Sequence, residues 1–178
     1  IPTKALLEHA HALKIAQGAK EWGLVLGPEP PRIDMNQVQT RKDKIVTVLT
    51  RGIEYLFKKN GIDWIKGSGR LAGPGKVEVT GGETQLLTAR QIVVATGSSA
   101  LSVPGIDLDR KRIITSDEAI FMREVPKSIV VMGSGPIGVE FATVFKRFGS
   151  DVTIVELLPH LVPLEDETIS VELEKAFK

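Results

Sequence analysis

The sequence predicts an α/β fold that combines an antiparallel β-meander with the start of a parallel sheet. Three observations support this prediction. Apolar residues recur at helical spacing through residues 1–58, and they alternate in short runs over residues 62–95. They return over residues 128–156 as two short β-branched runs that flank a helical pattern. A strand, a helix and a second strand in this order form the unit from which parallel sheets are built.

Two helices are expected at the start of the chain. Thr3 is a plausible N-cap for a helix over Lys4–Lys20, because a threonine hydroxyl can accept a hydrogen bond from a backbone N–H of the first turn. Asp34 can cap a second, longer helix over about Met35–Lys58 in the same way. Gly61 then favours the left-handed backbone that commonly ends a helix.

Short strand candidates follow, because the apolar spacing changes there from helical to alternating. They cover Ile62–Lys66, Lys76–Thr80, Thr84–Thr88 and Gln91–Ala95. Gly81 and Gly82 predict a turn between the second and the third of them. We therefore expect a small antiparallel meander that leads into one fully buried strand, Ile92–Ala95.

The next part of the chain is expected to be a crossover linker over about residues 96–105. Ser116 can then cap a short helix over Asp117–Met122. At the other end of the sequence, a proline-bearing loop precedes a final helix over about Glu165–Lys178.

Between these elements lies the stretch around which the chain is organised. Ser128–Met132 is short, apolar and β-branched, as a buried strand is. A helical pattern follows as far as Phe148, and Gly149 closes it. Val152–Val155 is a second buried strand. The order of strand, helix and strand predicts a parallel pair.

A glycine-rich turn joins the first of these strands to the helix. Its glycines have the spacing G-x-G-x-x-G, and an acid follows 23 residues after the first glycine, which is the dinucleotide-binding fingerprint in its required context. Gly133 permits the tight turn, Gly135 lets a diphosphate approach the backbone, and Gly138 lets the helix pack against the strand. The free N–H groups and the dipole of the helix start favour a negative charge there. The candidate binding residues of the turn are Gly133, Ser134, Gly135, Pro136, Ile137, Gly138, Val139 and Glu140. A turn that merely joins a strand to a helix is the alternative.

Glu156 is the acid that ends the second strand, and it predicts which nucleotide the turn binds. Its carboxylate can accept hydrogen bonds from both ribose hydroxyls of an adenosine, whereas a 2′-phosphate would face a like charge. The next four residues, 157–160, contain no arginine that could bind such a phosphate. We therefore expect NAD rather than NADP.

Composition excludes several other classes of function. The chain has 178 residues, 42% of them hydrophobic, and a net charge of +1, which gives no electrostatic basis for binding nucleic acid or an anionic membrane. It has no cysteine and no ligand spacing that suits a metal, so no metal site is expected. His9, His11 and His160 are expected to be structural. The lack of an export signal favours the cytoplasm, with an organelle left open.

Three stretches resemble the dihydrolipoamide dehydrogenases, which are pyridine-nucleotide disulfide oxidoreductases. They are IPTKALL at residues 1–7, QIVVATGS at residues 91–98 and GSGPIGVE at residues 133–140. In that family they correspond to the segment after the redox disulfide, to the strand and turn beside FAD, and to the NAD fingerprint. The resemblance covers essentially the whole chain. It implies a partial FAD-binding, Rossmann-like domain over residues 1–105 and a partial, inserted NAD-binding Rossmann domain over residues 106–178.

The resemblance also implies roles for single residues. Lys4 matches the lysine beside the flavin N5, and Glu140 matches the carboxylate that pairs with it and orients it. Gly69 matches a glycine whose backbone lies against the FAD adenosine, although a plain turn between strands is the alternative. Four further residues match the end of the strand and the turn that pass the flavin: Ala95, Thr96, Gly97 and Ser98.

The chain lacks other parts of the family pattern. It contains no C-x4-C, no first glycine fingerprint for FAD and no C-terminal interface domain. We therefore expect a fragment that is inactive by itself. The resemblance implies that the complete protein is a redox-active homodimer that oxidises dihydrolipoamide and reduces NAD⁺. The dihydrolipoamide would be carried by the lipoyl domain of 2-oxoacid dehydrogenase complexes. A related reductase for glutathione or mercuric ion and a non-catalytic nucleotide-binding module remain as alternatives.

Overall fold

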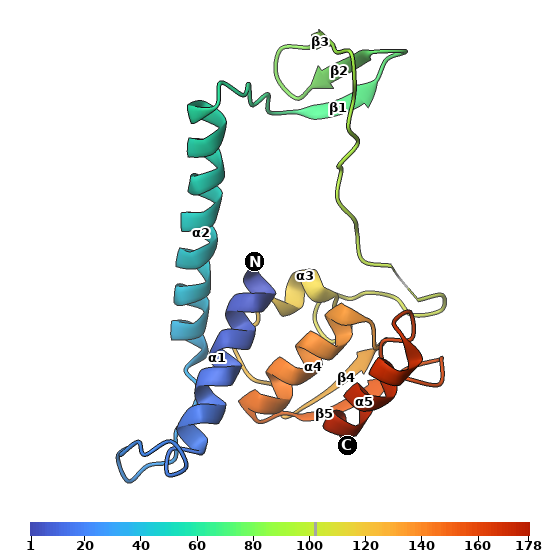
Figure 1. Ribbon diagram of the computed structural model, residues 1–178. Coiled ribbons are helices and arrows are strands. Elements are labelled where there is room, and N and C mark those ends of the chain that lie inside the picture. The colour runs from blue at the N-terminus through green and yellow to red at the C-terminus, as the bar shows by residue number, and fades with distance from the viewer. Residues whose placement is uncertain (102) are drawn as a thin grey trace. The chain divides into compact units, whose positions relative to one another are not determined.

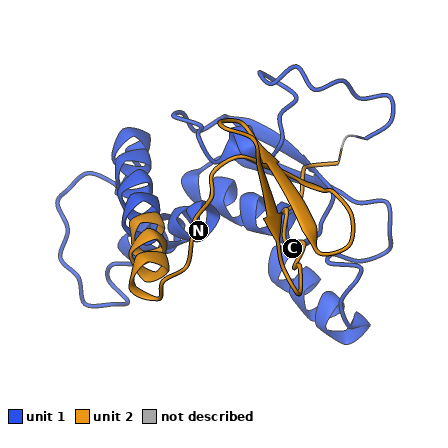
Figure 2. Ribbon diagram, turned by 90° about the horizontal axis from the view of Figure 1, so that it is seen from above, with its two compact units in different colours: residues 1–49, 102–178 blue, residues 50–101 orange. Residues whose placement is uncertain are grey.

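The computed structural model describes residues 1–101 and 103–178 (Figure 1). The helices are α1 (Pro2–Gln17), α2 (Met35–Lys59), α3 (Ser116–Ala119), α4 (Pro136–Phe148) and α5 (Glu167–Phe177), and the strands are β1 (Ser68–Leu71), β2 (Lys76–Thr80), β3 (Gln85–Thr88), β4 (Ser128–Met132) and β5 (Asp151–Val155). The chain divides into two compact units, residues 1–49 with 102–178, and residues 50–101 (Figure 2). No helix in the described part of the chain is both long and apolar enough to cross a bilayer.

The first unit is built around α4, which packs against α1 and against both strands of a parallel pair (Figure 1). The pair is β4 and β5, whose residues run in register from Ser128 beside Asp151 to Met132 beside Val155. This confirms the predicted order of strand, helix and parallel strand. The apolar face of α4 meets those of α1 and the start of α2 in one core, formed by Leu6, Ala10, Leu13, Met35, Val38, Ala119, Phe141, Val144, Phe145 and Phe148.

The second unit is an antiparallel meander in the order β1-β2-β3. Ser68 lies opposite Thr80 in the first pair, and Lys76 lies opposite Thr88 in the second. Both the meander and the turn at Gly81 follow the prediction, since Gly81 has a φ of 110° that suits glycine.

The expected strand over residues 62–66 does not form. The first strand of the meander is Ser68–Leu71 instead, and its pairing with β2 ends at Thr80. Residues 62–66 would lie beyond Thr80, where the partner chain turns away at Gly81, so no backbone is available there to pair with them. Alternating apolar residues alone cannot show where a partner strand ends.

The expected buried strand over residues 91–95 is also absent. These residues have no regular structure, and the side chains of Val93 and Val94 are 88% and 67% exposed. The last backbone contact before them is the hydrogen bond of 2.8 Å from the Ala89 N–H to the Gly75 carbonyl. A β-branched run has strand propensity, but a strand also needs a neighbour that supplies donors and acceptors, and no described residue does so here.

The helix boundaries lie close to the predicted ones, and the differences have local reasons. Helix α1 begins at Pro2 with Ile1 as its N-cap rather than Thr3, because proline has no N–H and suits the first helical position. Helix α3 is capped by Thr115 rather than Ser116, in a capping box with Glu118. Asp34 caps α2 as predicted, through a bond of 2.9 Å from the Asn36 N–H.

Candidate functional site

The glycine turn between β4 and α4 is geometrically demanding at two of its glycines. Gly133 has a φ of 92°, and its N–H donates to the Val155 carbonyl at 2.8 Å, which extends the parallel pair by one bond. A Cβ on Gly138 would lie 2.1 Å from the Gly133 carbonyl oxygen. No L side chain can therefore be accommodated at Gly138 unless the turn moves away from the helix.

Gly135 differs from these two, because a Cβ there would meet nothing within 4 Å. It is the N-cap of α4, and Pro136 begins the helix. The N–H groups of the first helical turn have no carbonyl to bind within their own helix, and the helix dipole adds positive potential at this end. The start of α4 beside Gly135 is therefore suited to an anion, although Pro136 has no N–H to donate.

Glu156, directly after β5, is held by the glycine turn itself. Its Oε2 accepts hydrogen bonds from the backbone N–H and the hydroxyl of Ser134, both at 2.8 Å. Its Oε1 accepts from the backbone N–H groups of Leu157 and Leu158, at 2.8 and 3.0 Å. These bonds, led by the one from the Leu158 N–H and followed by those from Ser134, lower the pKa of Glu156 to about 2. The carboxylate is therefore ionised at neutral pH and fixed in direction.

The contact between Ser134 and Glu156 is a feature that the sequence did not predict. Ser134 is wholly buried, and its N–H, expected to be free for a ligand, is bound to Glu156. Its carbonyl accepts a hydrogen bond of 3.0 Å from the Val162 N–H. The spacing of the turn gives the position of this serine but not the direction of its hydroxyl.

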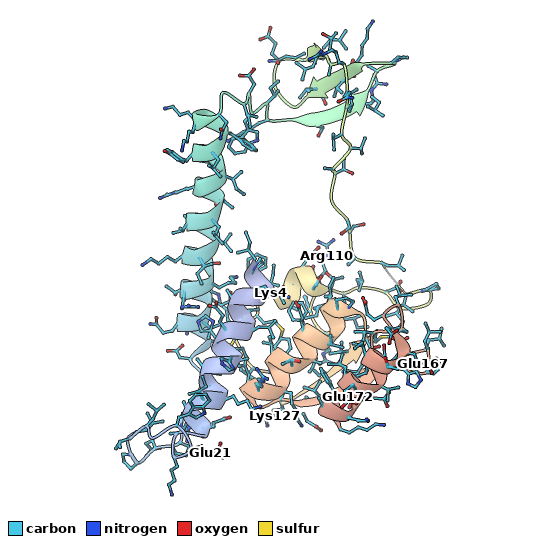
Figure 3. All side chains as sticks on the ribbon, in the orientation of Figure 1. Lys4, Glu21, Arg110, Lys127, Glu167 and Glu172 are labelled. Carbon is cyan, nitrogen blue, oxygen red and sulfur yellow. The ribbon has the colours of Figure 1, made fainter. Side chains whose placement is uncertain are left out.

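Lys4 and Glu140 form an ion pair, although 136 positions separate them in the chain. Lys4 lies in the first turns of α1 (Figure 3), and Glu140 lies in α4, so the packing of these two helices brings the charges together. The lysine side chain is 71% exposed and the glutamate 26% exposed. The pair thus lies at the surface of the first unit.

The remaining predicted site residues belong to the second unit: Gly69, Ala95, Thr96, Gly97 and Ser98. Gly69 lies in β1, and a Cβ there would make an ordinary contact of 3.5 Å with Val77. The more restricted glycine nearby is Gly67, where a Cβ would lie 2.4 Å from the Thr80 carbonyl oxygen. Gly69 was expected from the resemblance alone, and the pairing of β1 with β2 makes Gly67 the sterically restricted glycine.

Two of the histidines have structural contacts. His9 Nδ1 lies 2.8 Å from the Ala5 carbonyl, one turn earlier in α1. His160 lies beside α5, with Nδ1 3.3 Å from Glu174 and Nε2 3.8 Å from Glu167. The His9 contact lies within α1, and the His160 contacts join the loop after β5 to α5.

Comparison with known proteins identifies the family of the chain. A family model described as pyridine nucleotide-disulphide oxidoreductase matches residues 1–178. Dihydrolipoyl dehydrogenase 3 of Pseudomonas putida is 44% identical over 178 residues, covering 99% of this chain and 38% of that protein. Dihydrolipoyl dehydrogenase of Bacillus subtilis is 38% identical over 190 residues, covering 100% and 39%. Leghemoglobin reductase of Vigna unguiculata is 37% identical over 182 residues, covering 100% and 34%. The chain thus spans about two fifths or less of the length of these relatives.

Solved structures share the fold. The crystal structure of LpdA from Mycobacterium tuberculosis superposes with a TM-score of 0.84 at 25% identity, over 99% of this chain and 39% of that one. Both the mixed α/β architecture and the two kinds of sheet are therefore those expected from the sequence. With a family model that matches every residue and relatives that align from end to end, the chain belongs to the pyridine nucleotide-disulphide oxidoreductase family.

Proposed function

We propose that this chain is part of an NAD-linked, FAD-dependent dihydrolipoyl dehydrogenase. The observation that carries the proposal is the ionised Glu156 carboxylate beside the open glycine turn at the start of α4. It is supported by the Lys4–Glu140 ion pair and by the relatives named dihydrolipoyl dehydrogenase. Residues 1–105 would belong to the FAD-binding domain and residues 106–178 to the NAD-binding domain.

The residues of the first unit fit a dinucleotide. The open space at Gly135 leaves room for a diphosphate, and the N-terminus of α4 supplies donors and positive potential for it. The Glu156 carboxylate would accept hydrogen bonds from the adenosine ribose. Because that carboxylate is ionised throughout the neutral range, it would repel a 2′-phosphate there.

The Lys4–Glu140 pair fits a position beside the flavin. A lysine there stabilises negative charge, and the partly buried glutamate fixes the direction of its exposed side chain. When bound, FAD would supply the transfer of an electron pair from the reduced, dithiol form of a redox disulfide to NAD⁺ as a hydride, with reoxidation of the thiols to the disulfide. Ala95, Thr96, Gly97, Ser98 and Gly69 would line its binding site in the FAD-binding domain.

The wider biology follows from the same proposal. The thiol substrate would be dihydrolipoamide on the lipoyl domain of a 2-oxoacid dehydrogenase complex, and the enzyme would be a cytoplasmic homodimer. The relative named leghemoglobin reductase shows that similar identity accompanies a different named substrate. A reductase for another disulfide is therefore the second candidate.

Turnover by the full protein that carries these residues tests the proposal. We expect lipoamide to be reduced with NADH, NADPH to be used at least about tenfold less well, and glutathione disulfide not to be turned over. Equal use of NADH and NADPH would contradict the role of Glu156. Turnover of glutathione disulfide in place of lipoamide would support the second candidate, and a flavin-free protein without turnover would indicate a binding module.

A further inference from the structure

Ser134 is the most constrained polar residue of the glycine turn. It is 0% exposed, and its N–H and its hydroxyl both donate to the same carboxylate oxygen, Oε2 of Glu156, at 2.8 Å. Its carbonyl accepts from the Val162 N–H at 3.0 Å, and the Val162 carbonyl is bound in turn by the hydroxyl of the buried Ser170 at 3.1 Å. Ser134 is therefore held both by Glu156, directly after β5, and by Val162, in the loop that follows.

The acceptor that this hydroxyl uses is informative. Ser150, another buried serine of the same unit, donates its hydroxyl to a backbone carbonyl, that of Pro126, at 2.6 Å. A bond of this kind satisfies a buried hydroxyl and connects two segments. Ser134 donates instead to an ionised carboxylate, and hydrogen bonds to charged acceptors are roughly twice as strong as neutral ones.

The contribution of the hydroxyl can be separated from that of the backbone. The N–H groups of Ser134, Leu157 and Leu158 are available to Glu156 whatever side chain residue 134 carries. The fourth donor, the Ser134 hydroxyl, depends on the side chain alone. Without it, Oε2 keeps a single protein donor and the carboxylate gains freedom to rotate.

We propose that Ser134 is a positioning residue for nucleotide selection, whose buried hydroxyl holds the Glu156 carboxylate at the glycine turn, where it would face the adenosine ribose and oppose a 2′-phosphate. The inference rests on the proposed NAD site. Holding an acceptor in its binding direction before the ligand arrives reduces the cost of ordering it on binding. It also prevents the negative charge from turning away from a 2′-phosphate, so the same contact favours NADH and disfavours NADPH.

Direct titration of the full protein with NADH and with NADPH, each followed by fluorescence, tests this role without turnover. The ratio of interest is the Kd for NADPH divided by the Kd for NADH. We expect Ser134→Ala to lower this ratio about 3- to 10-fold, which is the effect of losing one hydrogen bond. Ser150→Ala is the matched control, because it removes an equally buried serine hydroxyl outside the turn, and it should leave the ratio unchanged. Ser134→Cys, of similar size with a weaker donor, should give an intermediate ratio and serves if the alanine variant does not fold.

Two further measurements distinguish positioning from a general structural effect. The pKa of the Glu156 carboxyl, followed by NMR without nucleotide, should rise in Ser134→Ala, because one of the bonds that favour its ionised form is lost. The double variant Ser134→Ala/Glu156→Gln should have the same nucleotide ratio as Glu156→Gln alone, since Ser134 acts through Glu156.

The outcomes separate this inference from the proposed function. An altered ratio in Glu156→Gln with an unchanged ratio in Ser134→Ala would overturn the role of Ser134 and leave the NAD site standing. Tighter NADH binding by Ser134→Ala would also overturn it, because the hydroxyl would then compete with the ribose for the carboxylate. An unchanged ratio in Glu156→Gln would overturn the NAD selectivity itself, and the role of Ser134 with it.

Discussion

At the scale of single residues, the first unit carries two carboxylates with different surroundings. Glu156 is bound by four N–H or O–H donors of the protein, while Glu140 is paired with a lysine that is largely exposed to water. Donors fixed by the backbone favour the ionised form of a carboxyl group, whereas water screens the attraction between exposed charges. We therefore expect Glu156 to make the stability of the first unit depend on pH, and the Lys4–Glu140 pair to have a small coupling energy.

Acid should weaken the first unit through Glu156. Its pKa in the folded protein, about 2, lies below the ordinary 4.5, so folding favours the ionised form. The stabilisation that this carboxylate contributes is therefore fully present above about pH 4.5 and is lost as the pH falls toward 2. The urea midpoint of Glu156→Gln should change less over this range than that of the unaltered protein.

Glu124, which is exposed and lies outside the glycine turn, supplies a control for this experiment. Glu124→Gln should follow the acid response of the unaltered protein. If Glu156→Gln followed it as well, the bonds from the turn would not stabilise the ionised form.

The Lys4–Glu140 pair should contribute little to stability. Because the lysine side chain is 71% exposed, a double-mutant cycle with Lys4→Met and Glu140→Gln should give a coupling energy below about 1 kcal/mol in the free energy of unfolding. The same variants should lower the rate of flavin reduction in the full protein, measured by stopped-flow absorbance. A large coupling energy with normal flavin reduction would make the pair structural.

At the scale of elements, the contact between the glycine turn and α4 depends on the absence of side chains at particular positions. Gly138 is closed by the Gly133 carbonyl, whereas Gly135 is open to its surroundings. Gly149, at the other end of the helix, has a φ of 109°, which ends α4 and directs the chain into β5. The turn therefore contains one glycine needed for packing and one that leaves space free.

Substitution of these two glycines should separate folding from binding. Gly138→Ala should lower the free energy of unfolding by about 1–3 kcal/mol, because its Cβ would lie 2.1 Å from a backbone oxygen. Gly135→Ala should cost less than about 1 kcal/mol, from the poorer N-cap, while it weakens NADH binding. Chemical denaturation and NADH titration of both variants check this. Equal loss of stability in both would mean that the turn relaxes around a side chain at Gly138.

At the scale of the whole molecule, the two units differ in how much apolar surface they bury. The core of the first unit joins residues from four helices, with Phe141 and Phe145 stacked at a centroid distance of 6.2 Å. Among residues 50–101, all of which the structure describes, Val79 is the single buried hydrophobic residue. The two units should therefore differ in local stability, because buried apolar area supplies most of the free energy of folding.

Native-state hydrogen exchange of the 178-residue chain should show this difference. The backbone amides of β1, β2 and β3 should exchange faster, by about tenfold or more, than those of α1 and α4, because opening the meander exposes little buried surface. Mass spectrometry of exchanged peptides measures it. Equal protection of both units would mean that the chain unfolds as one cooperative body.

Some features are decided by local chemistry, and these the sequence by itself determined. The spacing of apolar residues predicts the strand over residues 128–132, and Gly149 predicts the end of the helix at Phe148. The alternation of apolar and polar residues, together with the glycine turn, predicts the meander. The positions of the glycine fingerprint and of Glu156 followed from spacing in the same way. The sequence also indicated the family, because the motifs that identify it are short, continuous stretches.

Other features depend on which distant segments meet, and only the tertiary structure decided them. The sequence does not show that residues 62–66 and 91–95 lack partner strands, or that Ser134 directs its hydroxyl to Glu156. Nor does it show that Lys42, a charged residue in a surface helix, is 1% exposed and donates to the Ile120 carbonyl at 3.1 Å. The physical reason is common to all of these features. Strand pairing and side-chain burial are set by contacts between residues far apart in the chain, and such contacts leave no local pattern.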